Sequence, residues 1–551
     1  MHNQLPNLNL PAPEPWPDDI EKFEFKNVCS VEMIKCIESL TNSTAASHDT
    51  LSNKMVKYSK YRICEVLASI TNNCFKTGKF PNFWKLAKVK PLHKKGVLTE
   101  AKNYRPIALL CSLSKVVERA VSKQIISYLG LYGFYDKRQY GYRSGHSTNH
   151  AILDLLQVII EAKNTPASQY KINTLMLDLS AAFDLVDHEL LLLKLKNYGF
   201  GDLALSFVRS YLTGRSMEVK VGIECSKRVP ITCGVPQGSV LGPLLYTILI
   251  SDIQDINNHP KILYADDTSC AVVARGSAEL EDKTNAAMRD LVNYYHNLRL
   301  KLNASKTEII NHNTKNALVD VVINSATGEV QTSVPNARLL GMQIDADLSF
   351  KKHIDNLVRD VKYYIKMFNR LPEGVSLRAK RTLGIGLLIS RITFGISVYA
   401  SASNSDLRKV RIAYHDCLRA IIGKKSRTRN RKMSLKELHR SLALPTFHSL
   451  VKYFDAVSFK TMLDRHEPHH LYKHINQDYI FQTRASNNQI VKIKFIPRNE
   501  KSKRSYLVRA VKTFNSLPTK IRKLRGESFK KAVKKFLYER DIQDTVSCKL
   551  S

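Results

Sequence analysis

Apolar residues recur at helical spacing in several stretches of this 551-residue sequence. Residues 113–129 form one such stretch, and a second begins after Ser147 or Thr148, either of which can cap a helix. Its apolar side carries Ile152, Leu155, Leu156 and Ile159. From about residue 280 the pattern is mostly helical to the end. The sequence therefore predicts a helix-rich protein.

Two short apolar runs have the length of strands, and both contain acidic residues. Residues 172–179 form the first run, which Asp178 interrupts. The second predicts a strand over 261–265, a tight turn at Asp266 and Asp267, and a return strand over 268–274. Two-residue hairpin turns prefer Asn-Gly or Asp-Gly, and adjacent anions repel by about 1 kcal/mol in water. We expect a cation to offset that repulsion.

Basic residues greatly outnumber acidic ones. The chain has 85 Lys and Arg against 49 Asp and Glu, a formal charge of +36, and residues 401–551 contribute +23 of it. Such a surplus indicates an anionic partner, nucleic acid first and an anionic membrane surface second. The densest stretch contains Lys424, Lys425, Arg427, Arg429, Arg431 and Lys432. It is interpreted either as a phosphate contact or as a solvated loop or nuclear-import signal.

Several function classes find no support. The ten cysteines include no CxxC pair, and a HExxH pattern at 466–470 is interrupted by Pro468, so no zinc is expected. The first residues lack a secretory signal, and residues 383–402 contain Arg391, which favours a buried helix pair over a membrane span. We therefore expect an intracellular protein without a membrane partner, in the nucleus or cytoplasm of a eukaryotic host.

Acidic residues at strand ends in a basic protein indicate a two-cation site for phosphoryl chemistry. Mg²⁺ takes one or two carboxylates, keeps its waters and binds substrate phosphates. Two such ions about 3.5–4 Å apart activate an attacking oxygen and stabilise a leaving one. The alternative is that these are exposed turn acids, because nothing local brings Asp178 near Asp266.

Six motifs occur in an order that resembles the reverse transcriptases of non-LTR (LINE-type) retrotransposons. They occupy residues 84–85 with 91–96, 103–107, 139–148, 177–184, 234–239 and 264–267. The resemblance covers about residues 25–345. It implies an α+β right-hand polymerase with fingers, an antiparallel-sheet palm and a helical thumb, followed by a mostly helical basic C-terminal region.

The resemblance also implies roles for individual residues. Asp178 would bridge two Mg²⁺ ions, with Mn²⁺ as an alternative, Asp266 would complete their binding, and Asp267 would lie beside them. The residues that would bind the dNTP are Lys94, Arg105, Phe183, Gln237 and Lys306.

In that resemblance Phe183 excludes a 2′-hydroxyl, and Gln237 contacts the nucleotide near its 3′-hydroxyl. Arg105 and either Lys94 or Lys95 meet the triphosphate, and Lys306 lies near the leaving pyrophosphate. Residues 339–341 resemble the primer-grip hairpin. The alternatives to these roles are that Arg105 forms a surface ion pair and that Phe183 occupies an ordinary core position.

The implied division is a disordered leader over 1–25, fingers and palm over 26–345, a helical thumb over 346–425, and a basic nucleic-acid-binding region over 426–551. The implied function is RNA-directed DNA polymerase, with template RNA, primer or target DNA, and dNTPs as partners. The alternative is a non-catalytic nucleic-acid-binding protein derived from a retroelement.

The sequence departs from the family pattern in three places. Residues 45–50 lack the usual Pro-Gly-Pro-Asp-Gly-like loop, residues 1–25 are too few for an upstream endonuclease domain, and a C-terminal Cys/His zinc knuckle is absent. We therefore expect a truncated copy that polymerises but does not integrate alone.

Overall fold

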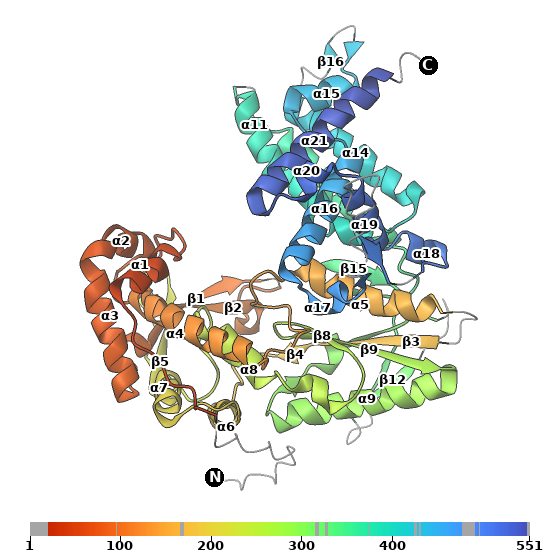
Figure 1. Cartoon of the computed structure of the whole chain (residues 1–551). Coiled ribbons are helices and arrows are strands. Elements are labelled where there is room, and N and C mark those ends of the chain that lie inside the picture. The colour runs from red at the N-terminus through yellow and green to blue at the C-terminus, as the bar shows by residue number, and fades with distance from the viewer. Residues whose placement is uncertain are drawn as a thin grey trace.

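A central sheet joins two groups of helices in the computed structural model of the chain (Figure 1). One group lies beside the sheet, and the other rises above its opposite end as a column that contains most of the C-terminal helices. The structure describes residues 20–94, 96–165, 170–313, 319–324, 329–372, 374–423, 427–428, 431–476, 491–494 and 496–547.

The apolar run before Asp178 becomes an inner strand of a four-stranded antiparallel sheet. The strand order is β11 (Glu308–Asn311), β3 (Tyr170–Leu177), β9 (Asp267–Arg275) and β8 (Lys261–Tyr264). Side chains alternate between the two faces of a strand, so Leu175 and Leu177 join one hydrophobic core while Ile172 and Met176 join another. Because both faces are buried, the strand is almost continuously apolar.

Helices cover both faces of this sheet. Helix α9 (Ser277–Asn297) packs on one face and α5 (Thr148–Lys163) on the other. The Ser147 hydroxyl caps α5 by accepting a hydrogen bond from the backbone N–H of His150 at 3.3 Å. The helix predicted after Ser147 or Thr148 is therefore confirmed, with Ser147 as its cap.

The helices beside the sheet form the first body of the molecule with a small second sheet. The helices are α1 (Ser30–Glu38), α2 (Asn53–Tyr58), α3 (Lys60–Thr77), α4 (Ser112–Leu131), α6 (His188–Asn197), α7 (Asp202–Leu212) and α8 (Leu241–Leu249). The small sheet contains β2 (Tyr104–Leu109), β1 (Leu86–His93), β5 (Arg215–Val221), β6 (Glu224–Cys225) and β7 (Val229–Ile231).

The end of the predicted leader is part of this body. Phe23 is buried against Tyr128 and Phe200, and Phe25 stacks on Phe75 with ring centroids 4.7 Å apart. Aromatic side chains at 23 and 25 bury large apolar areas, which anchors this short segment. Residues 1–19 lie outside the described residues.

Residues 301–345 contain strands, so the expectation of a mostly helical pattern from residue 280 is wrong for this stretch. Besides β11, the strands are β10 (Lys301–Leu302), β12 (Asp320–Asn324), β13 (Glu329–Thr332), β14 (Asn336–Leu339) and β15 (Met342–Asp345). Strands β14 and β15 form a hairpin whose turn residues, Leu340 and Gly341, both have positive φ. These strands are only two to five residues long, which hides them from a periodicity argument over a longer window.

The C-terminal column is helical and built on the second core. Its main helices are α10 (Lys351–Phe368), α11 (Leu377–Gly384), α12 (Ser390–Thr393), α13 (Ile396–Tyr399), α14 (Asn404–Ile422), α15 (Leu435–Leu442), α16 (Phe447–Arg465), α17 (His469–Tyr472), α18 (Glu500–Lys503), α19 (Tyr506–Asn515), α20 (Thr519–Arg522) and α21 (Gly526–Ser547), with a π-helical turn at Ile385–Ile389. Short strand pairs lie at β16 (Arg427–Thr428) with β17 (Arg431–Lys432) and at β18 (Ile475–Asn476) with β19 (Lys492–Ile493).

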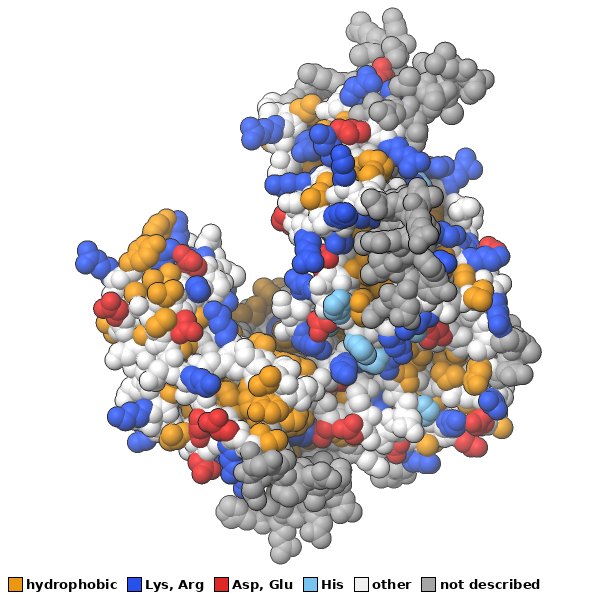
Figure 2. Space-filling view, viewed as in Figure 1, with side chains coloured by type: hydrophobic (Ala, Val, Ile, Leu, Met, Phe, Trp, Pro, Cys, Tyr) orange, Lys and Arg blue, Asp and Glu red, His pale blue; other side chains and the backbone are white. Residues whose placement is uncertain are grey.

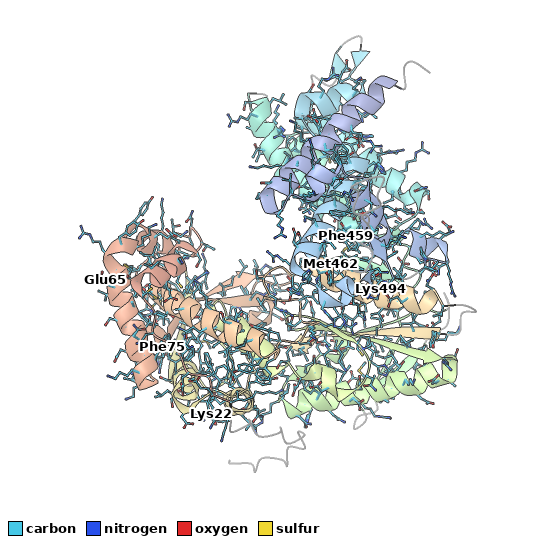
Figure 3. The ribbon with its side chains drawn as sticks, in the orientation of Figure 1. Lys22, Glu65, Phe75, Phe459, Met462 and Lys494 are labelled. Carbon is cyan, nitrogen blue, oxygen red and sulfur yellow. The ribbon has the colours of Figure 1, made fainter. Side chains whose placement is uncertain are left out.

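Phe459 and Met462 of α16, labelled in Figure 3, lie inside that second core. The same core includes the side chains of α5 that face the central sheet, such as Ile152 and Leu155. The column is therefore fixed to the sheet by shared hydrophobic packing. An ion pair between Arg143 and Glu467, at 3.3 Å, adds a polar contact across the same junction.

The chain is 54% helical and 16% strand, and its central sheet is antiparallel, so the predicted α+β fold class is confirmed. The apolar stretch at 383–402 folds as short helical segments that contribute to the second core. Within the described part of the chain, none of the helices combines the length and apolarity that crossing a bilayer requires.

Candidate active site

The acidic hairpin lies at the edge of the central sheet. Tyr264 pairs with Asp267, so the two turn residues are Ala265 and Asp266, and the predicted turn at Asp266 and Asp267 is wrong by one position. Ala265 has a φ of 59°. A positive φ at the first turn position alone is the pattern of a type II′ turn, which favours glycine there. The turn is therefore strained, as backbone at functional sites often is.

Asp178 lies beside this hairpin because of the strand register. Leu177 pairs with Thr268, so the next residues along the two strands, Asp178 and Asp267, face each other at the end of the ladder. Beyond Asp178 the chain leaves β9, and β4 (Leu179–Ser180) pairs with β10 instead. The bend places a single acidic residue between two strand pairings. Residues 88 positions apart are thereby brought together.

The three carboxylates interact electrostatically. Burial, together with the charges of Asp266 and Asp178, raises the pKa of Asp267 to about 6. Burial also raises the pKa of Asp266, and Asp178 adds to it, whereas Arg105 and Lys306 act in the opposite direction. Raised carboxyl pKa values mean that the ionised site is costly without further positive charge.

Lys306 supplies part of that charge. Its ammonium group donates a hydrogen bond to Asp178 Oδ2 at 2.9 Å. The backbone N–H of Asn303, in the same short turn, donates to the Asp178 carbonyl at 2.8 Å. The Lys306 side chain is 64% exposed, so it can leave Asp178 without breaking core packing.

The donor set fits Mg²⁺. Among the described residues, no three His, Cys, Asp or Glu side chains form a ready-made metal cluster. Mg²⁺ does not need one, because it binds through one or two carboxylates and takes waters and substrate phosphates for the rest. Asp178 and Asp266 are hard oxygen donors, and the raised pKa values of Asp266 and its neighbour Asp267 show that these two carboxylates lack full cationic compensation.

The strained turn is supported by the predicted loop at 139–148. The side-chain oxygen of Gln139 accepts hydrogen bonds from the backbone N–H groups of Gly141, at 2.8 Å, and Ala265, at 3.2 Å. A Cβ at position 141 would come within 2.3 Å of the Ala265 nitrogen, so only glycine fits there. The loop therefore fixes the position of the neighbouring Asp266.

An aromatic cluster lies next to the carboxylates. The ring of half-buried Phe183 packs on Tyr246 with centroids 4.7 Å apart and meets Tyr142 edge to face at 6.2 Å. The charge of Asp266 contributes to a raised pKa at Tyr142, after burial. Phe183 is thus neither free nor fully buried, and one part of it remains available to a ligand.

The Gln237 side chain is held by Asp184, an acidic residue of the motif at 177–184. Its side-chain amide donates to both carboxylate oxygens of Asp184, at 2.7 and 2.9 Å. The two loops are also joined by backbone hydrogen bonds from Val235 to Phe183 and from Gly234 to Val186, each at 2.8 Å. This arrangement places Gln237 and Phe183 side by side.

The cations of the small sheet face the site from the first body. Arg105 on β2 is exposed and pairs in register with Leu92 on β1, and its charge acts on Asp266. Lys94 follows β1 and is exposed. Lys95 lies outside the described residues, so the choice between Lys94 and Lys95 stays open.

The dense basic stretch is only partly covered by the structure. Lys424, Lys425 and Arg429 lie outside the described residues, and the side chains of Arg427, Arg431 and Lys432 do as well. The prediction that this stretch contacts nucleic acid stays a prediction.

Sequence reasoning missed Gln139, Tyr246 and the partnership of Asp184 with Gln237. Each acts through a contact to a residue far away in the sequence, which spacing cannot show. A signal did exist for Asp184, an acidic residue next to the aromatic Phe183 in a loop motif.

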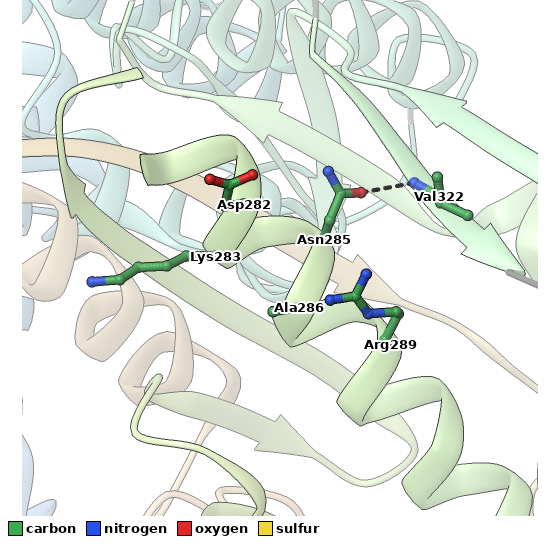
Figure 4. A pocket seen from close by; sticks show the side chains of 6 residues that line it. All are labelled: Asp282, Lys283, Asn285, Ala286, Arg289 and Val322. Carbon is green, nitrogen blue, oxygen red and sulfur yellow. Dashed lines mark hydrogen bonds between the residues drawn. The ribbon is translucent and has the colours of Figure 1, made fainter. Parts of the chain in front are cut away.

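The pocket on α9 is separate from the three carboxylates. The pocket in Figure 4 lies on the outer side of α9, where Asn285 accepts a hydrogen bond from the backbone N–H of Val322 at 3.1 Å. Its lining mixes Asp282 with Lys283 and Arg289, and it includes none of the three site carboxylates.

Acidic strand ends on an antiparallel sheet, covered by helices and faced by cations from a separate body, are typical of a template-dependent nucleic-acid polymerase. Residues 92–344 match the family of reverse transcriptases (RNA-dependent DNA polymerases). These residues are therefore similar to reverse transcriptase domains, and together with the retrotransposon relatives below this match confirms the predicted resemblance.

Curated relatives support the same assignment. The probable RNA-directed DNA polymerase from transposon X-element of Drosophila melanogaster is 28% identical over 79% of this chain and 48% of that protein. The RNA-directed DNA polymerase from mobile element jockey of Drosophila melanogaster is 29% identical over 74% of this chain and 45% of that protein. The chain therefore spans about half the length of these relatives.

Among solved structures, telomerase from Candida albicans in complex with a fragment of telomeric RNA is 13% identical and covers 73% of this chain and 69% of that one. Its TM-score is 0.34, too low to carry an argument.

Proposed function

We propose that the chain is an RNA-directed DNA polymerase that extends a primer 3′-hydroxyl with dNTPs on an RNA template. The observation that carries this proposal is the register of β3 and β9, which sets Asp178 opposite Asp267 and beside the turn residue Asp266. In this proposal residues 26–345 are fingers and palm, 346–425 are thumb, and 426–551 bind nucleic acid. The printed names of the relatives support the reaction class.

Asp178 and Asp266 would hold two Mg²⁺ ions, or Mn²⁺, with Asp267 beside them. The ions, when bound, supply activation of the attacking hydroxyl and stabilisation of the leaving oxygen. Asp178 and Asp266 orient the reacting groups, because each approaches from a rigid strand end. Lys306, which pairs with Asp178 in the structure, would lie near the leaving pyrophosphate and neutralise its charge.

The nucleotide site lies between the aromatic cluster and the cations. Arg105 and Lys94 would bind the triphosphate, where a guanidinium group matches phosphate geometry with two parallel hydrogen bonds. Phe183 would pack under the sugar and exclude a 2′-hydroxyl. Gln237, oriented by Asp184, would contact the sugar near its 3′-hydroxyl.

Primer extension on an RNA template tests the reaction. We compare the wild type with Asp266→Asn and with Asp282→Asn, a control that removes an acid from the outer side of α9. The proposal requires extension by the wild type and by the control, and a loss of at least about 100-fold in Asp266→Asn. Equal extension by all three proteins, or by none, would favour a non-catalytic nucleic-acid-binding protein.

Nucleotide selection provides a second test. Replacing Phe183 by Val shortens the side chain under the sugar, so incorporation of ribonucleotides should rise relative to dNTPs while primer binding stays unchanged. An unchanged ratio of ribonucleotide to dNTP incorporation would mean that Phe183 serves only core packing and does not select the sugar.

A further inference from the structure

A cavity of about 620 Å³ opens among the C-terminal helices, away from the carboxylates. It lies between the first half of α14, the start of α16 and the junction of α18 with α19. Arg408, Arg411, His448 and Arg504 line it, and none of its lining residues in the described structure is acidic. We refer to it as the α14 pocket.

These basic side chains come from three separate segments of the chain. Arg408 and Arg411 are three residues apart on α14, so they share one face of the helix. His448 stands in the first turn of α16, and Arg504 ends α18. The charged arginines come from two separate elements, α14 and the end of α18, which is not explained by the solvated face of one helix.

The cavity wall is fixed by hydrogen bonds. Arg509 pairs with the buried Asp455 at 3.2 Å and donates to the carbonyls of Arg504, at 2.6 Å, and Ser397, at 2.7 Å. The Arg509 charge is therefore satisfied within the protein, and the guanidinium holds the Arg504 backbone in place. Arg504 also donates to the carbonyl of Ala402 at 3.5 Å.

Arg408 and Arg411 differ from Arg509 in this respect. Both are exposed, and neither forms a salt bridge with any described residue. The His448 imidazole has a lowered pKa because of burial and the charge of nearby Lys452. His448 is therefore neutral, and the positive charge of the pocket comes from its arginines, which no carboxylate in its lining compensates.

The pocket on α9 shown in Figure 4 is a useful contrast. It is of similar size, about 660 Å³, but Asp282 lies beside Lys283 and Arg289 in its lining. Figure 2 shows that Lys and Arg side chains are frequent over the C-terminal helices and acidic ones are sparse. The α14 pocket combines that surface charge with a concave wall that hydrogen bonds of Arg509 hold in place.

We propose that the α14 pocket binds a backbone phosphate of the nucleic acid on which the chain acts. This inference rests on the proposed function for the identity of the ligand. The planar guanidinium groups of Arg408 and Arg411 suit bidentate phosphate contacts, and a contact to a phosphate carries no sequence information by itself.

The double variant Arg408→Gln/Arg411→Gln of the full chain tests the proposal by fluorescence anisotropy with a labelled 20-bp DNA duplex and a labelled single-stranded RNA. Each phosphate contact contributes about 0.9 to the slope of log K against log salt for duplex DNA and about 0.7 for single strands. Losing the contact to this one phosphate should lower the slope by about 0.9 and weaken duplex binding roughly tenfold near 0.1 M salt.

The matched control is Lys283→Gln/Arg289→Gln, which removes the same charge at the α9 pocket. It should leave slope and affinity near the wild-type values. A second variant, Arg408→Lys/Arg411→Lys, keeps the charge and should restore most of the slope. Circular dichroism establishes that all variants are folded.

Wild-type affinity and slope in the glutamine variant, or an equal loss in the control, would overturn the proposal. A calorimetric titration with inorganic phosphate distinguishes a phosphate of the nucleic-acid backbone from that of a small phosphate compound. Phosphate binding that the glutamine substitutions abolish, with nucleic-acid affinity unchanged, would assign the pocket to a small phosphate compound and overturn the backbone contact. If the proposed polymerase function is wrong, this would appear in a separate measurement, as the absence of primer extension by the wild type.

Discussion

Removing the charge of Asp267 should stabilise the chain when no divalent cation is present. Strand register sets Asp267 opposite Asp178, and Cβ atoms of directly opposed residues lie about 4.5–5.5 Å apart. Two unit charges about 5 Å apart repel by about 0.8 kcal/mol in water and about 3 kcal/mol at an effective dielectric constant of 20. Although the Asp267 carboxylate is partly desolvated, the residue is exposed to solvent at the sheet edge, so screening favours the lower figure and Asp267→Asn should gain about 1 kcal/mol.

The assay is thermal unfolding in EDTA and in excess Mg²⁺. Unfolding entropy is about 2.1 cal/mol/K per residue, so about 1 kcal/mol over roughly 320 residues of fingers and palm raises the midpoint by about 1.5 °C. Because Mg²⁺ binds the folded wild type, its addition should close or reverse this difference. Asp282→Asn on α9 serves as the control and should respond to Mg²⁺ as the wild type does.

The pH dependence of the difference is fixed by the pKa of Asp267, which rises from an ordinary 3.8 to about 6 in the folded chain. Between these values the folded state binds the proton that the unfolded state has released, so wild-type stability falls as pH rises. The gap between variant and wild type should therefore open from about pH 4 to about pH 7. A variant that is less stable than the wild type in EDTA at pH 7 would refute the reasoning.

Three further changes have directions set by single contacts. Gly141→Ala should lower both stability and primer extension, since its Cβ would meet the Ala265 nitrogen at 2.3 Å; unchanged melting and extension would contradict this. Tyr246→Phe should stabilise by roughly 0.5–1.5 kcal/mol in denaturant unfolding, because the buried hydroxyl has no partner among the described residues. Asp184→Asn should raise the KM for dNTPs more than it lowers kcat, because it releases Gln237, and a pure kcat effect would argue against that role.

Much of the secondary structure followed from local rules. The cap at Ser147 and the apolar run of β3 are both set by neighbouring residues, and the structure has them. The hairpin was found but its turn was misplaced by one residue. The turn instead contains an alanine at positive φ, which local rules disfavour and which the hydrogen bond to Gln139, 126 positions away, supports.

The composition of the site was predictable, but its geometry was not. Asp178 and Asp266 were singled out because acids interrupt apolar strands, yet only the register of β3 with β9 joins them. Strands over 301–345 escaped notice because they are short. One of them, β10, helps to bend the chain at Asp178, so the error concerned an element that shapes the site.

The charge distribution explains why a cation is needed where DNA would grow. The chain carries +36 overall, which favours any approaching polyanion, but the reacting phosphates must arrive beside three carboxylates. Lys306 and Arg105 contribute two positive charges there, so the fully ionised cluster keeps a net negative charge. Phosphate would be repelled from such a cluster, and protonation would remove the very donors that hold it in place. A divalent cation resolves both conflicts, because it attracts the phosphate and lowers the pKa of the carboxylates in the same step.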